Sequence, residues 1–123
     1  MKKIAFILIA MLGISLHAQQ NLAARFNPKS YAEHLSQNIQ NTLGISDQAV
    51  ISKLNNDAYI YAQSIRKYLI LYGQRGELEG KTLEEGIEMV LPDVEKSSHF
   101  KDMLKRLLGP SKVNKLINKG IIK

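Results

Sequence analysis

The chain has 123 residues, 17 of them Lys or Arg and 11 Asp or Glu, which gives a formal net charge of +6 at pH 7. It contains no cysteine, which excludes disulfide bonds, thiolate metal ligands and a cysteine nucleophile. The hydrophobic fraction of 45% and the charged fraction of 23% are typical of a chain that folds, and the length fits one domain.

The N-terminal segment has the layout of a secretory signal peptide. Lys2 and Lys3 are followed by an uncharged apolar run from Ile4 to Leu16, and Ala18 supplies the small residue before a cleavage site. The run is shorter than the roughly 20 residues that a bilayer span needs. The alternative, a buried N-terminal helix, would need neighbours on every side because the run has no polar face. We therefore expect removal of residues 1–18, with residues 19–123 forming a single helical domain in the periplasm or outside the cell, without a transmembrane anchor.

The first helix predicted after this segment begins near residue 27. Asn27 is typical of an N-cap before Pro28 at the first helical position, and Phe26 is placed to pack on Tyr31. Apolar residues then recur every four positions until Gly44, which predicts the end of the helix. They are Tyr31, Leu35, Ile39 and Leu43.

The second predicted helix is the longest, from about residue 47 to 72. Ser46 is its expected N-cap and Gly73 its expected end. At 1.5 Å per residue the helix is about 39 Å long, so we expect it at the centre of the fold.

Three shorter helices complete the prediction. Thr82 and Glu85 form a capping box that starts a helix expected to end at Pro92. Another helix spans about residues 98–108, and Ser111 is the expected cap of the last one. The sequence has no alternating strand pattern or hairpin signal. These features predict an all-α fold, a small bundle of about five helices around the long one.

The motifs that could carry catalysis or bind a cofactor are weak. Gly80-Lys81-Thr82 reproduces the end of a phosphate-binding loop, but Arg75 occupies the position that requires the first glycine. Glu95, His99 and Asp102 have helical spacing and could form a small metal-dependent hydrolase site, although a surface ion pair explains them better. No serine, histidine and acid pattern indicates a triad. We expect no cofactor and, more readily than an enzyme, a binding protein.

The long helix carries more apolar surface than one stripe needs. Its tyrosines suit both a core and an interface, because each ring combines apolar area with a polar end. The sequence therefore leaves two readings open, core lining or a strip that binds a protein partner or a second copy of the chain. The candidate residues are Tyr59, Ile60, Tyr61, Tyr68, Ile70, Leu71 and Tyr72.

Charge is separated along the chain. Residues 77–95 contain seven acidic residues and one basic residue, whereas residues 96–123 contain eight basic residues and one acidic residue. Lys112, Lys115 and Lys119 share one face of the last predicted helix and could bind an anionic lipid or glycan surface. The alternative is that the acidic and basic segments pair with each other. No motif indicates binding to nucleic acid.

Overall fold

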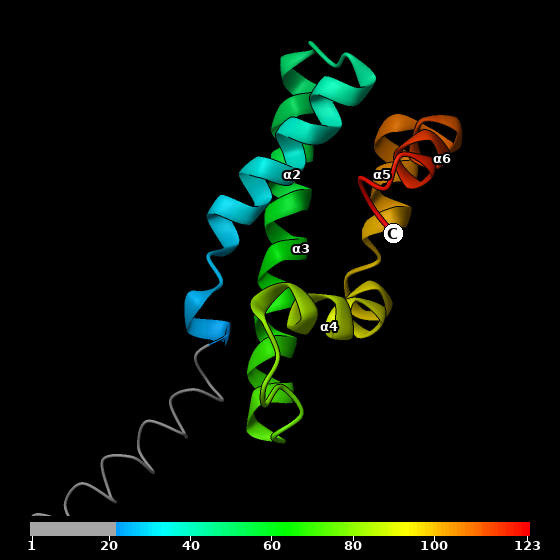
Figure 1. Cartoon of the computed structure of the whole chain (residues 1–123). Coiled ribbons are helices and arrows are strands. Elements are labelled where there is room, and N and C mark those ends of the chain that lie inside the picture. Colours follow the sequence, from blue (N-terminus) through cyan, green and yellow to red (C-terminus); the bar gives the residue numbers. More distant parts are fainter. Residues whose placement is uncertain (1–21) are drawn as a thin grey trace, which may run out of the picture.

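The computed structural model of the chain describes residues 22–123, and every regular element in this part is an α-helix (Figure 1). The all-α prediction is confirmed for these residues. The predicted signal peptide, residues 1–18, lies outside the described residues. A helical turn at 22–25 precedes α2 (Pro28–Leu43), α3 (Gln48–Gln74), α4 (Leu83–Ser98), α5 (Phe100–Leu108) and α6 (Pro110–Asn118).

Helix α2 begins and ends as its local sequence predicts. The Asn27 side chain accepts a hydrogen bond from the Ser30 amide at 3.1 Å, and Pro28 is the first helical residue. The rings of Phe26 and Tyr31 lie 5.3 Å apart across the start of the helix. Gly44 ends it with a φ of 65°, which a glycine adopts without steric cost.

Helix α3 differs from the prediction at both ends. Its N-cap is Asp47, whose carboxylate accepts from the Ala49 amide at 2.9 Å, so the expected cap Ser46 is wrong. The helix also continues through Gly73 to Gln74. Gly73 is buried within the last turn, and the Arg75 amide still donates to the Leu71 carbonyl at 3.2 Å. Packing at Gly73 outweighs the tendency of glycine to end a helix.

Helix α4 starts at the predicted capping box but does not stop at Pro92. The Glu85 amide donates to the Thr82 hydroxyl at 3.1 Å, and the Thr82 amide donates to the Glu85 carboxylate at 3.0 Å. Val90 and Val94, on either side of Pro92, are fully buried. A proline inside a helix costs about 3 kcal/mol. Burial of the flanking turns offsets that cost, so the helix extends to Ser98.

Gly86 allows α4 to approach the core closely. A Cβ atom at this position would lie 3.0 Å from Leu22 Cδ1 and 3.4 Å from Leu69 Cδ2. The absence of a side chain therefore lets α4 pack directly on α3 and on the residues that precede α2.

The last two helices are set by two sharp changes in backbone direction. His99 has a φ of 53° and separates α4 from α5, so α5 starts at Phe100 rather than at residue 98. Gly109, with a φ of 94°, precedes Pro110 at the start of α6, and the predicted cap Ser111 is wrong. Proline is favoured at the first helical position, where its missing N–H is not needed.

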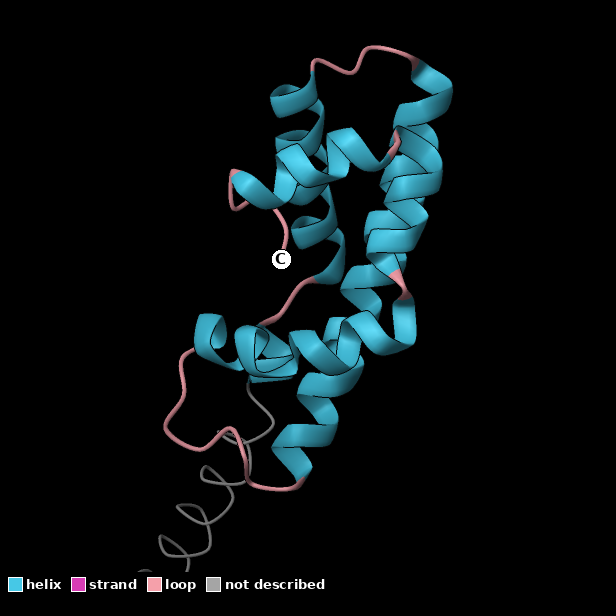
Figure 2. Ribbon diagram, turned by 90° about the vertical axis from the view of Figure 1, so that its right-hand side faces the viewer, coloured by secondary structure: helices cyan, strands magenta, loops and turns pink. Residues whose placement is uncertain are grey.

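The helices pack mainly on α3. Helix α2 runs antiparallel beside its first half, α4 crosses its second half, and α5 turns back beside the first half (Figures 1 and 2). Helix α6 packs on α5 and contacts α2. No helix within residues 22–123 is long and apolar enough to span a membrane. The fully buried residues that α3 contributes to the core are Leu54, Ala58, Ala62, Ile65 and Leu69.

Candidate functional site

The seven candidate residues of α3 divide by exposure. Tyr59, Ile60 and Ile70 are exposed, with 41%, 41% and 40% of their surface accessible. Met89 on α4 is the other large hydrophobic residue that is exposed in the described part of the chain. The half-buried candidates are Tyr68, Leu71 and Tyr72, and Tyr61 is buried.

Tyr61 belongs to the core. Its ring stacks on Phe100 at a centroid distance of 4.2 Å and an interplanar angle of 16°. Burial, with smaller contributions from Tyr31 and Glu95, raises the pKa of Tyr61 well above its ordinary value of 10. Tyr61 therefore joins α3 to α5 and offers little surface to a partner.

Tyr72 connects α3 to α4. Its hydroxyl donates to Asp93 Oδ2 at 2.5 Å, and this hydrogen bond is the main reason that the pKa of Tyr72 is raised. The guanidinium of Arg75 lies 5.9 Å from the Tyr72 ring centroid. The polar end of Tyr72 is therefore engaged within the chain, unlike the exposed Tyr59.

Tyr59 and Ile70 line an open groove of about 560 Å³ between α3 and the start of α2. Three cations, Lys29, Arg66 and Lys67, border the groove, and no carboxylate lines it. The remaining lining residues are neutral: Asn27, Pro28, Gln63, Leu71 and Gln74.

The groove exists because α3 is longer than α2. Ser36 Oγ donates to Asn55 Oδ1 and so fixes the register of the two antiparallel helices. In this register α2 begins beside the middle of α3, and the later turns of α3 extend beyond it (Figure 1). A second hollow of about 480 Å³ shares Lys29 and Tyr59 and continues along the seam of α2 and α3. We name the 560 Å³ part, beyond the start of α2, the α3 groove.

The acidic and basic segments meet at one ion pair within residues 22–123. Lys123 Nζ lies 2.8 Å from Glu88 Oε1, and the adjacent Ile122 is buried. Lys112, Lys115 and Lys119 are exposed on or directly after α6 and form no ion pair with the described residues. Internal pairing therefore accounts for the end of the basic segment and leaves the three lysines of α6 facing solvent.

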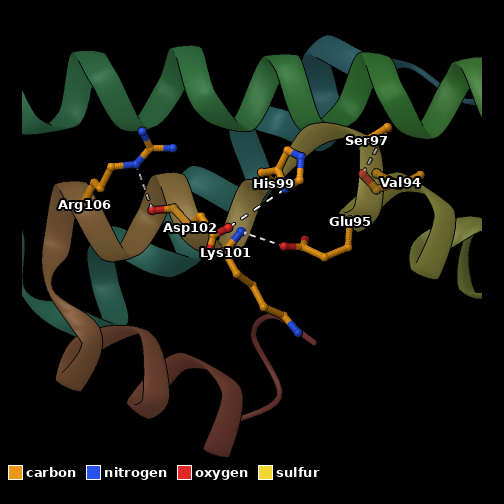
Figure 3. Close-up of polar contacts among 7 residues, drawn as sticks. All are labelled: Val94, Glu95, Ser97, His99, Lys101, Asp102 and Arg106. Carbon is orange, nitrogen blue, oxygen red and sulfur yellow. Dashed lines mark hydrogen bonds and ion pairs between the residues drawn. The ribbon is translucent and has the colours of Figure 1, made fainter.

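Glu95, His99 and Asp102 do not converge (Figure 3). His99 Nδ1 is 3.9 Å from Asp102 Oδ2, whereas Glu95 accepts a hydrogen bond from the Lys101 amide at 3.0 Å. The predicted shared face requires a continuous helix, and the left-handed backbone of His99 interrupts it. No group of three or more His, Asp or Glu residues within 22–123 is arranged to hold a metal ion.

The residues that resemble the end of a phosphate-binding loop form the start of helix α4. Thr82 caps α4, and its hydrogen bonds with Glu85 lower the pKa of that carboxyl below its ordinary value of 4.5. The segment follows helix α3, whereas a phosphate-binding loop follows a strand.

Sequence reasoning identified the exposed residues of α3 but missed Lys29 as part of the same site. Lys29 lies on another helix, and only the register of α2 on α3 brings it to the groove. Comparison of the chain with protein-family models, with curated proteins and with solved structures gives no match. Its function is therefore argued from its own residues.

Proposed function

We propose that the chain is an exported, non-enzymatic protein-binding module that binds a partner through the exposed apolar residues of α3. The observation that carries this proposal is the exposure of Tyr59, Ile60 and Ile70 on a single helix. Tyr59 and Ile70 also line the same groove, and exposed apolar residues that gather in one place are typical of interaction sites. The start of the sequence, with Lys2, Lys3 and the apolar run to Leu16, supports export.

The chemistry of these residues suits an interface. Tyr59 can bury a large ring while its hydroxyl stays at the polar edge, and tyrosine is among the residues that dominate binding energy. Ile70 and the half-buried Leu71 add apolar area in the same groove. A partner that covers them gains roughly 25 cal/mol for each Å² of apolar surface removed from water.

Three carboxylates of α4 have structural partners within the chain. Glu85 caps α4, Glu88 pairs with Lys123, and Glu95 accepts from the first turn of α5. These contacts give each acid a role in the fold, which supports binding rather than catalysis.

The test compares variants on two exposed apolar sites. The purified protein and its Ile70→Ser, Tyr59→Ser and Met89→Ser variants are used to capture proteins from the envelope of the source cell, and their masses are measured by light scattering. We expect the two α3 variants to lose a captured partner or a self-associated species that the wild type and the α4 control Met89→Ser retain. The same captured proteins and the same mass for all four would contradict the proposal.

A second candidate function is binding to an anionic surface through α6. Lys112, Lys115 and Lys119 are exposed on one side of this helix, and none forms an ion pair with the described residues. Reversal of the three charges should reduce retention on vesicles of phosphatidylglycerol and phosphatidylcholine, and on heparin. Unchanged retention on both would remove this candidate.

A further inference from the structure

The α3 groove has an unbalanced charge. Lys29 borders it from α2, and Arg66 and Lys67 border it from α3, with no carboxylate among the lining residues. None of the three forms an ion pair within the described part of the chain. Lys67 lies 5.9 Å from the centroid of the Tyr68 ring, a contact that leaves its charge uncompensated. The apolar residues Tyr59 and Ile70 therefore lie beside three cations, and Glu33 belongs to the lining of the adjoining hollow.

Charged residues around an apolar site select binding partners by the sign of the partner's charge. Opposite charges across an interface accelerate association, and like charges suppress it. A partner segment that covers Tyr59 and Ile70 must also place some of its own side chains beside the three cations. Carboxylates are the groups that stabilise this arrangement.

The dimensions of the groove favour a helix as the bound segment. Tyr59 and Ile70 are separated by about three turns, or roughly 16 Å along α3 at 1.5 Å per residue. Helix α2 already packs on the earlier turns of α3, and the groove begins where α2 begins. A partner helix could therefore pack on the exposed later turns in the same manner.

We propose that the α3 groove binds an acidic amphipathic helix of another protein, with an apolar stripe on Tyr59, Ile70 and Leu71 and carboxylates beside Lys29, Arg66 and Lys67. This inference rests on the proposed function and adds the chemistry of the partner. Recognition of an amphipathic helix in a groove is a recurrent mode of binding.

A second copy of the chain is a poorer occupant. A symmetric contact through the groove would bring Lys29, Arg66 and Lys67 against the same three residues of the partner copy. A contact with α4 of another copy would compete with internal roles, because Glu85 caps its own helix and Glu88 pairs with Lys123. The charges therefore favour a different, acidic protein.

The test uses two designed helical peptides of equal length with the same stripe of leucine and isoleucine. One carries glutamate on its polar face and the other carries lysine at the same positions. Binding of each labelled peptide to the purified protein is measured by fluorescence anisotropy at several salt concentrations. We expect the acidic peptide to bind at least about 10-fold more tightly, and its affinity to fall as salt screens the charges.

Two triple variants with the same change in net charge locate the effect. Lys29→Glu, Arg66→Glu and Lys67→Glu together should reverse the preference between the peptides. The control, Lys53→Glu, Lys81→Glu and Lys105→Glu together, lies outside the groove and outside α6 and should leave the preference unchanged. All substituted residues are exposed, and the helical signal in circular dichroism checks that each variant folds.

Several results would overturn the inference. They are equal binding of both peptides, binding of neither, equal loss of acidic-peptide binding in both triple variants, and binding that Ile70→Ser does not weaken. Equal binding that Ile70→Ser weakens would overturn the acidic partner yet leave the proposed function standing. Vesicle binding lost only in the groove variant would assign the groove to a membrane instead, and a dimer lost only in that variant would assign it to a second copy.

Discussion

Two hollows on the molecule contain similar kinds of residue but differ in how their charges are satisfied. The α3 groove, of about 560 Å³, combines apolar side chains with three cations. A cleft of about 710 Å³ between α4, the start of α5 and the C-terminus combines Tyr61, Leu91 and Pro92 with basic and acidic side chains. We name it the α4 cleft. Its charged lining residues are Glu88, Glu95, Lys96, His99, Lys101 and Lys123.

The difference lies in the position of the carboxylates. In the α4 cleft, Glu88 pairs with Lys123 and Glu95 accepts from the Lys101 amide, so the chain supplies a partner for each of the two carboxylates. In the α3 groove no carboxylate is present. The comparison shows that the fold places acidic and basic side chains together in the α4 cleft and only basic ones in the α3 groove.

Tyr59 lines the α3 groove and Tyr61 lines the α4 cleft, although they lie only two residues apart on α3. We expect Tyr61→Ala to lower the free energy of unfolding by about 3 kcal/mol or more, because a buried aromatic ring and its stack on Phe100 are lost. Tyr59→Ala, on the exposed side, should change it by less than about 1 kcal/mol. Urea unfolding of both variants measures the difference. Equal losses would show that the two sides of the helix are not energetically distinct.

The C-terminal residues test how far the end of the chain, whose Lys123 lines the α4 cleft, contributes to the fold. Ile122 is 8% exposed, so Ile122→Ala should cost about 2 kcal/mol, the lower end for truncation of a buried isoleucine. Ile70→Ala in the α3 groove is the matched control and should be nearly neutral. Thermal unfolding provides the measurement. An unchanged midpoint for Ile122→Ala would contradict the packing of the C-terminus into the core.

The buried Tyr61 also predicts a dependence on alkaline pH. Because burial raises the pKa of Tyr61 above 10, the folded state holds this side chain neutral. Its contribution is complete below pH 10, the ordinary value, and declines as pH rises above it.

Tyr61→Phe isolates this contribution because it keeps the ring and removes the ionising hydroxyl. We expect the free energy of unfolding of the Tyr61→Phe variant, measured in urea, to fall less between pH 9 and 11 than that of the wild type. The raised pKa values of Tyr31 and Tyr72 affect both proteins alike, so the difference reports on Tyr61. Parallel pH profiles would contradict the prediction.

The smallest effect is expected at the ion pair of the α4 cleft. The side chains of Lys123 and Glu88 are 67% and 66% exposed, so Glu88→Gln should cost no more than about 1 kcal/mol. The cost should shrink in high salt and disappear when Lys123 is also changed to Gln. Glu84→Gln on the same helix is the control. An equal effect of both single changes would indicate a general charge effect instead of a specific pair.

The parts of the fold that sequence predicted correctly depend on neighbouring residues. The caps at Asn27 and Thr82 involve donors and acceptors three positions apart, so the local sequence contains the whole interaction. The helix ends predicted at Gly73 and Pro92 are wrong because packing extends both helices beyond these residues. Gly73 and the valines on either side of Pro92 are buried, and that burial outweighs the local preference of glycine and proline to end a helix.

The same distinction applies to the candidate site. Excess apolar residues on one helix predicted Tyr59, Ile60 and Ile70 as surface candidates, and they are exposed. The burial of Tyr61 depends on Phe100, and the contribution of Lys29 depends on the register of α2. Both require contacts between residues far apart in the chain, which periodicity does not reveal.

Pro92 has a consequence for the timescale on which α4 opens. Because proline has no N–H, the Glu88 carbonyl lacks its usual donor one turn later, and the hydrogen-bond ladder is interrupted there. The turns after Pro92 can open without melting the turns before it. Their amide protons should therefore exchange with solvent faster. That end of α4 holds Glu95, which accepts from the Lys101 amide, so opening after Pro92 would release the first turn of α5 while the capping box at Thr82 stays intact.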